Sequence, residues 1–152
     1  MWQSLGLIYH VRASIYEKSE DFLKAKAVAL VALEFCNNAM NLNYISIVEY
    51  RLGAIELYLG NIDEARKLWQ KIIRQNFKGQ ELRLIAGTQL SLAELERDFG
   101  SEADALYWAQ IAQEGFAEIG FKDLYKQAVT MIQNLLADHS RSAIKQLKLS
   151  SD

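Results

Sequence analysis

The 152-residue sequence contains no proline and a single cysteine. Proline is the strongest helix breaker, because it removes a backbone hydrogen-bond donor and clashes with the preceding turn. Cys36 has no second cysteine in the chain with which to form a disulfide, which suits a reducing compartment. The composition therefore permits long helices throughout and excludes a fold held together by internal disulfides.

An excess of charge of one sign is also missing, since 17 Lys and Arg stand against 19 Asp and Glu, for a net charge of −2. The basic residues are dispersed and do not form the stripe that nucleic acid binding requires. The most apolar run, residues 27–33, is too short to cross a bilayer, and no secretory signal pattern opens the sequence. We expect a cytoplasmic protein whose partners include neither nucleic acid nor membrane.

Residues that commonly carry catalysis are few. His10 and His139 belong to opposite ends of the sequence, and Cys36 has no nearby base to activate it as a nucleophile. The acidic pairs fall where helices are expected to begin and negative charge complements the helix dipole: Glu20/Asp21, Asp63/Glu64 and Glu102/Asp104. We therefore predict no catalytic residues, no metal site and no cofactor.

Apolar residues recur with helical spacing, and no segment alternates as a strand would. In the segment SIVEYRLGAIELYLG, apolar residues follow one another at intervals of three to five, which is typical of a helix. Gly60 is suited to end this helix in a left-handed conformation. Asn61 is a suitable N-cap for the next helix, and Glu64 would complete a capping box. The pattern predicts two antiparallel helices joined by a tight turn.

The same arrangement occurs three times at an interval of 40 residues. Small or apolar residues align in three columns without a gap: Ala13/Gly53/Ala93, Ala25/Ala65/Ala105 and Ala32/Ile72/Ala112. Small side chains let two helix backbones approach closely. Each helix pair then leaves an apolar face that the next pair must cover, so we expect the pairs to stack into an array.

This pattern resembles the tetratricopeptide repeat, and the segment RLGAIELYLGNIDEARKLW is the closest match. The repeat here has 40 residues instead of about 34, and the proline that commonly closes each repeat is missing. The longer unit is similar to extended variants in bacterial regulators and in scaffold proteins of cell polarity. The resemblance implies an all-α, right-handed superhelical stack of antiparallel helix pairs that binds protein or peptide segments, or that serves as the sensor part of a larger switch.

We predict one repeat domain over residues 1–152. The expected helices are 2–18 and 21–38 in the first repeat, 43–59 and 62–76 in the second, and 81–98 and 102–118 in the third. Residues 121–149 are expected to form a C-terminal capping helix or a fourth helix pair. Trp69 and Trp108 are expected to lie in the core, as is Cys36.

The family's concave surface is lined by the first helix of each repeat, and the resemblance transfers its positions to ten residues of this chain. They combine aromatic and aliphatic side chains with charges of both signs, which suits an amphipathic helix or an extended segment as ligand: His10, Ser14, Glu17, Lys18, Tyr50, Leu57, Tyr58, Leu90, Glu94 and Arg97. Tyr50 and Leu57 have an alternative role, which is to pack against neighbouring helices.

Three functions remain open from the sequence. The first is a non-catalytic module that binds a protein or peptide in the concave groove. The second is an effector-sensing fragment of a larger bacterial transcriptional or signalling regulator. The third is a self-associating scaffold that forms a homodimer through the end face of the first helix, where we expect Trp2, Leu5 and Ile8 to be exposed.

Overall fold

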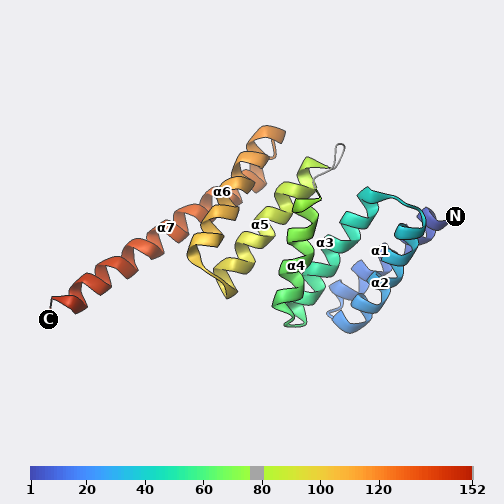
Figure 1. Ribbon diagram of the computed structural model, residues 1–152, viewed down its shortest axis with the longest axis horizontal. Helices are drawn as coiled ribbons and strands as arrows, with labels where there is room; N and C mark the ends of the chain where they lie inside the picture. Colours follow the sequence, from blue (N-terminus) through green and yellow to red (C-terminus); the bar gives the residue numbers. More distant parts are fainter. Residues whose placement is uncertain (76–80, 152) are drawn as a thin grey trace. The chain divides into compact units, whose positions relative to one another are not determined.

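A computed structural model describes residues 1–75 and 81–151, and all regular structure in them is helical. The helices are α1 (Trp2–Lys18), α2 (Phe22–Asn38), α3 (Leu42–Tyr58), α4 (Ile62–Arg74), α5 (Leu82–Phe99), α6 (Glu102–Ile119) and α7 (Lys122–Ser150) (Figure 1). Helices that are consecutive in the sequence pack against each other within α1–α2–α3, α3–α4 and α6–α7. The predicted all-α class is confirmed, and this succession is compatible with a helical repeat.

The chain divides into two compact units. Unit 1 comprises Met1–Leu84 and unit 2 comprises Ile85–Asp152. Unit 1 therefore contains α1 to α4, and unit 2 contains most of α5 together with α6 and α7. The superhelical sense of the stack and its organisation as one repeat domain stay predictions.

The predicted helix boundaries agree with the observed ones to within one or two residues for the first six helices. The predicted end of α4 at residue 76 lies outside the described residues. The alternative of a fourth helix pair is wrong, because α7 is one uninterrupted helix of 29 residues. No glycine or proline follows Gly120, so nothing in that segment favours a break.

The aligned small residues lie at the helix contacts. Seven alanines and Ile72 in the three columns are 0% exposed, and Gly53 is buried as well. A Cβ atom added at Gly53 would overlap the indole of Trp69, which itself is 3% exposed. Trp108 packs against the core of unit 2. The structure thus confirms that these columns mark close helix contacts and that both tryptophans contribute to the cores.

Cys36 is buried in a small cluster of unit 1 with Ala32 and Val48. Burial raises the pKa of its thiol, because the charged thiolate is disfavoured away from water. A Cβ atom at Gly6 of α1 would come within 2.8 Å of the Cys36 sulfur. Cys36 therefore behaves as the small core residue that the sequence predicted.

The turn between α3 and α4 differs from the prediction in one respect. Gly60 is left-handed, with φ of 83°, and Asn61 occupies the N-cap of α4. However, the Asn61 side chain makes no capping hydrogen bond. Its amide instead donates to the carboxylate of Glu56 at 2.6 Å. The predicted capping box with Glu64 is therefore wrong, because a nearby buried carboxylate competes for the Asn61 side chain.

None of the helices in the described part of the chain is both long and apolar enough to cross a membrane.

Candidate functional site

Two side chains of α1 contact one side chain of α3 on one face of unit 1. Residues 10, 14 and 17 follow each other at intervals of four and three along α1, so they share one side of that helix. The same spacing places Arg51, Ala54 and Tyr58 on one side of α3. We define the α1–α3 face by these six residues: His10, Ser14, Glu17, Arg51, Ala54 and Tyr58.

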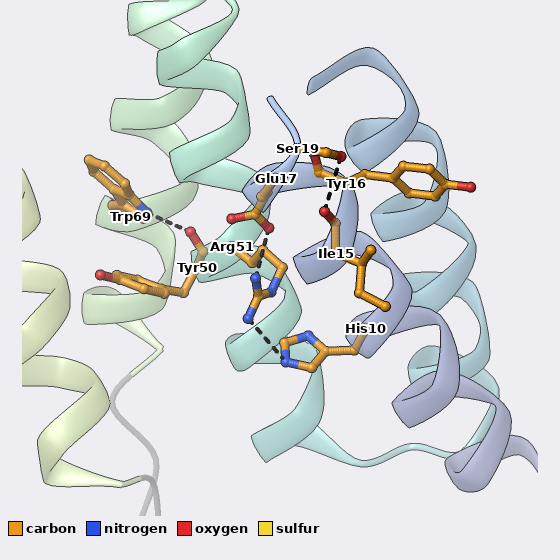
Figure 2. A network of polar contacts seen from close by, with 8 residues as sticks. All are labelled: His10, Ile15, Tyr16, Glu17, Ser19, Tyr50, Arg51 and Trp69. Carbon is orange, nitrogen blue, oxygen red and sulfur yellow. Dashed lines mark hydrogen bonds and ion pairs between the residues drawn. The ribbon is translucent and has the colours of Figure 1, made fainter. Parts of the chain in front are cut away.

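Arg51 links the two helices at the centre of this face (Figure 2). Its guanidinium donates from Nη1 to Oε1 of Glu17 at 2.8 Å, and its Nη2 lies 3.5 Å from Nε2 of His10. The side chains of Arg51 and Glu17 are only 24% and 21% exposed. An ion pair this far from solvent is screened less than a surface pair, so it holds α1 and α3 together in a defined arrangement.

The surroundings of His10 favour its neutral form. Partial burial and then the positive charge of Arg51 lower the pKa of its imidazole below the ordinary value of 6.5. If Nε2 accepts from Arg51, the ring proton resides on Nδ1. His10 Nδ1 and Arg51 Nε are buried and have no hydrogen-bond partner among the described residues. The cluster therefore retains unused hydrogen-bonding capacity, which is uncommon for buried groups.

Tyr58 supplies an exposed aromatic ring at the end of α3. The side chain is 69% exposed, yet its ring stacks on Phe22 with the centroids 4.6 Å apart and the planes 8° from parallel. Such contact restricts the rotamers of Tyr58 before any ligand arrives. A fixed, exposed aromatic ring loses little side-chain entropy on binding, which is a property of interface hot spots.

Tyr50, by contrast, packs against its neighbour in unit 1. Its ring stacks on Trp69 with centroids 6.0 Å apart, and its backbone carbonyl accepts a hydrogen bond from the Trp69 indole at 3.0 Å. Leu57 is half-buried. These contacts agree with the packing role left open for Tyr50, whereas Tyr58 remains accessible.

The remaining predicted residues fall into three groups. Ser14 is half-buried and Lys18 is exposed in unit 1. Glu94 and Arg97 are exposed on α5 in unit 2. Leu90 is 6% exposed and belongs to the core of unit 2. Its side chain is not accessible there, so we leave Leu90 out of the proposed binding surface.

Glu94 and Arg97 have distinct electrostatic environments. Arg97 pairs with Asp98, from Nε to Oδ1 at 2.8 Å, and this hydrogen bond is the main cause of the lowered pKa of Asp98. Although the Glu94 side chain is exposed, neighbouring atoms remove part of its hydration and raise the pKa of its carboxyl group, an effect that the positive charge of Arg97 opposes and the negative charge of Asp98 adds to. These residues form a charged row on α5, described here as part of unit 2 alone.

Arg51 was not among the predicted site residues, although the sequence contained a signal for it. It lies seven residues before Tyr58 and three before Ala54, which places it on the same side of the helix. Two buried acidic residues of α3 were also missed. Glu56 pairs with Lys26 of α2 at 2.7 Å, and Glu49 pairs with Lys71 of α4. Both pairs connect neighbouring helices.

The predicted acidic pairs have structural contacts. Asp21 caps α2 by accepting from the backbone of Lys24, and Asp63 and Glu64 pair with Arg66 and Lys67 one turn later. In unit 2, Glu102 lies 3.5 Å from the exposed His139. Across residues 1–75 and 81–151, no group of three or more His, Cys, Asp or Glu side chains is arranged to hold a metal ion.

The residues expected to mediate self-association differ in exposure. Trp2 is 44% exposed and its ring stacks on Phe35 at 5.8 Å. Ile8 is 54% exposed, whereas Leu5 is half-buried. The accessible apolar surface of α1 therefore includes Ile8 and extends only partly to Trp2.

No protein-family model matches the sequence, and comparison with curated proteins gives no significant match.

Proposed function

We propose that this chain is a non-catalytic interaction module of the cytoplasm, similar to tetratricopeptide repeats, and that the α1–α3 face binds a peptide or protein segment. The observation that supports this most is Tyr58, a 69% exposed ring held in place by Phe22. Arg51 lies two turns before Tyr58, about 10 Å along α3 at 1.5 Å per residue. An apolar anchor at Tyr58 and a polar group at the Arg51–Glu17–His10 cluster would fit one amphipathic segment.

The polar cluster gives the proposed interface its specificity. Arg51 and Glu17 are partly shielded from water, so a ligand that covers them must match their hydrogen-bonding groups or lose affinity. Within the described part of the chain, Arg51 Nε and His10 Nδ1 still have no hydrogen-bond partner. We infer that a bound segment satisfies part of this capacity through a small rearrangement of the two side chains.

Substitution of Tyr58 by alanine tests the proposal. Peptides would be selected from a displayed random library on the whole protein, and their affinities measured by fluorescence anisotropy. We expect Tyr58→Ala to weaken the selected peptides by at least about tenfold, as for hot-spot aromatics. Far-ultraviolet circular dichroism should remain unchanged, because Tyr58 is largely exposed.

Tyr107→Ala is the matched control. Tyr107 is also an exposed tyrosine, at 55%, and it also has one aromatic neighbour, Trp108 at 5.0 Å. It lies on α6 in unit 2, whereas the residues of the α1–α3 face belong to unit 1. Equal affinities for the two variants, or a library that yields no peptide above background, would remove the α1–α3 face as the binding site.

A second candidate is the sensing of a small effector, as part of a larger bacterial regulator. It is favoured by a pocket of about 470 Å³ in unit 2, which lies between the start of α6 and the middle of α7. Ala103, Leu106, Leu135 and Leu136 line it, with Glu102 and His139 beside them. Such a volume suits a small, mainly apolar molecule.

A thermal-shift screen of candidate metabolites tests the second function, since a ligand that binds only the folded protein raises its melting temperature. Ala103→Trp should abolish any such shift by filling the pocket, because Ala103 is exposed and lines it. A shift that survives Ala103→Trp would place the effector elsewhere.

A further inference from the structure

The turn between α6 and α7 (Figure 1) contains a pocket of about 370 Å³ within unit 2. We call this site the turn pocket. Six side chains from the two helices and the turn line it, and Gly120 adds only backbone: Phe116, Ala117, Phe121, Lys122, Tyr125 and Lys126. The volume lies at the lower end of the range for small-molecule sites, roughly 300–1,000 Å³, so the turn pocket suits a small ligand.

The backbone of the turn pocket is fixed by the end of α6. Gly120 is left-handed, with φ of 76°. Its amide donates to the carbonyl of Ala117 at 3.3 Å, and the Phe121 amide donates to the carbonyl of Phe116 at 3.1 Å. These two bonds are those of a Schellman motif. They hold this side of the pocket in place before a ligand binds, which lowers the entropy cost of binding.

Aromatic rings form much of the wall of the turn pocket. Phe116 is fully buried, and Phe121 is 36% exposed. Tyr125 packs against the core of unit 2, and its hydroxyl accepts a hydrogen bond from Nε2 of Gln113 at 3.3 Å. Such a wall favours a ligand with an aromatic ring, because aromatic groups attract each other in offset and edge-to-face arrangements.

Two lysines give this apolar site a positive charge. Of the described residues that line the turn pocket, only Lys122 and Lys126 are charged. They are four residues apart on α7, so they lie on one side of that helix. Both are exposed, and neither forms an ion pair with another residue of 1–75 or 81–151. Their ammonium groups are therefore available to a negatively charged ligand.

The acidic residues beside the turn project in other directions. Glu118 and Asp123 each stand next to a lining residue in the sequence, and successive side chains of a helix project about 100° apart. Neither of them lines the turn pocket. The two lysines therefore attract an anion without competition from a carboxylate of the lining.

We propose that the turn pocket binds a small aromatic carboxylate. Its ring would lie among the aromatic side chains of the wall, and its carboxylate would pair with Lys122 and Lys126. Such a division into an apolar wall and a few charged groups that fix orientation is usual for small-molecule sites.

This site goes beyond the peptide-binding function, which is proposed for a face of unit 1. It also shares no lining residue with the effector pocket beside Glu102 and His139. The carboxylate of Glu102 in that second pocket repels an anion, so the charge of the ligand distinguishes the two sites.

Titration of the full chain with phenylacetate, followed by nuclear magnetic resonance, tests the proposal. Chemical-shift changes of the backbone amides should concentrate in residues 116–126, with a dissociation constant in the millimolar range for so small a ligand. Phenylacetamide and phenethylamine carry the same phenyl ring with a neutral and a cationic head group. The amide should bind at least about threefold more weakly, since exposed ion pairs contribute modestly, and the amine more weakly still.

Two variants locate the site. Ala117→Trp should abolish the shifts, because Ala117 is exposed and an indole at this position fills the turn pocket. Ala103→Trp is the matched control, since it places the same side chain at another exposed alanine of α6, outside the turn pocket. It should leave the affinity for phenylacetate unchanged.

The double variant Lys122→Gln with Lys126→Gln tests the role of charge. It should lower the affinity for phenylacetate to that for phenylacetamide and leave the affinity for the amide unchanged. Both lysines are exposed, so this variant should fold and decides the question even if Ala117→Trp does not fold. Circular dichroism checks the fold of each variant.

Several results would overturn the proposal. These are equal affinities of the unaltered chain for phenylacetate and phenylacetamide, an absence of shifts in residues 116–126, or binding that persists in a folded Ala117→Trp. Undiminished affinity for phenylacetate in the double lysine variant would overturn it as well. None of these results bears on the peptide site of unit 1, because no residue is shared between the two sites.

Discussion

At the scale of single residues, two turns of unit 1 place residues other than glycine in the left-handed backbone conformation. Glu20 and Met40 follow α1 and α2 with φ of 59° and 51°, whereas Gly60 follows α3 with φ of 83°. A Cβ atom costs about 1–2 kcal/mol in this conformation, and glycine avoids the cost. Glu20 stands 40 residues before Gly60, so the same turn of two successive repeats is strained in the first and relaxed in the second.

Glycine at these two positions should stabilise the protein. We expect Glu20→Gly and Met40→Gly each to raise the free energy of unfolding by about 1 kcal/mol, because the relief of strain exceeds the added flexibility of the unfolded chain. Met40 is 85% exposed, so little packing is lost. Urea denaturation measures the change. Gly60→Ala, the reverse control, should lower the denaturation midpoint, and a lowered midpoint for both glycine variants would contradict the prediction.

The residues of the α1–α3 face were only partly predictable from sequence. The resemblance to the tetratricopeptide repeat indicated His10, Ser14, Glu17 and Tyr58. The pairing of Glu17 with Arg51 spans 34 residues, and such a contact depends on how closely two helices approach. The sequence also could not show that Asn61 donates to Glu56 instead of capping α4. A capping propensity describes the local preference of a residue and does not include other hydrogen-bond partners that the fold brings near it.

At the scale of helices, the contact between α3 and α4 depends on the missing side chain of Gly53. Gly53→Ala should lower the free energy of unfolding by about 1–3 kcal/mol, the usual cost of overpacking, because its Cβ would overlap the Trp69 indole. The Trp69 hydrogen bond to the Tyr50 carbonyl would be disturbed as well. Thermal or urea denaturation measures the loss.

Gly87→Ala is the matched control for Gly53→Ala. Gly87 also lies inside a helix, α5, but a Cβ atom there meets nothing within 4 Å. Alanine is the better helix former by about 0.5–1 kcal/mol, so this variant should be stabilised. If both variants lose the same amount of unfolding free energy, the loss is caused by the changed helix backbone and not by the contact with Trp69.

The end of α7 is helical without support from packing. Every residue from Leu136 to Ser150 is exposed, and a helix of this length is marginal in water by itself. We expect the backbone amides of residues 140–150 to exchange with solvent deuterium much faster than those around Met131, which packs on α6. Hydrogen-exchange mass spectrometry checks this, and equal protection along α7 would mean that residues 140–150 are held by a contact such as self-association.

At the scale of the whole molecule, the succession of packed helices was predictable because the columns of small residues repeat in the sequence. Ala13, Ala25 and Ala32 mark contacts in unit 1, and Ala93, Ala105 and Ala112 mark them in unit 2. The division into two units has no equivalent in these columns, which continue unchanged from the second repeat to the third. The columns of small residues indicate how the two helices of one pair pack against each other. How strongly one pair is connected to the next depends on residues outside these columns.

The two units should therefore lose structure separately. Phe116 is fully buried in a core shared by α5, α6 and α7, and Ile55 is fully buried in a core of unit 1. Phe116→Ala and Ile55→Ala should each cost several kcal/mol, roughly 2–5 for such truncations. In Phe116→Ala, hydrogen exchange should accelerate in α6 and the first half of α7 and stay slow in α1 and α2. Ile55→Ala should give the reverse pattern, because each of the two residues belongs to the core of one unit. Equal acceleration in both units would show that all seven helices unfold as one cooperative body.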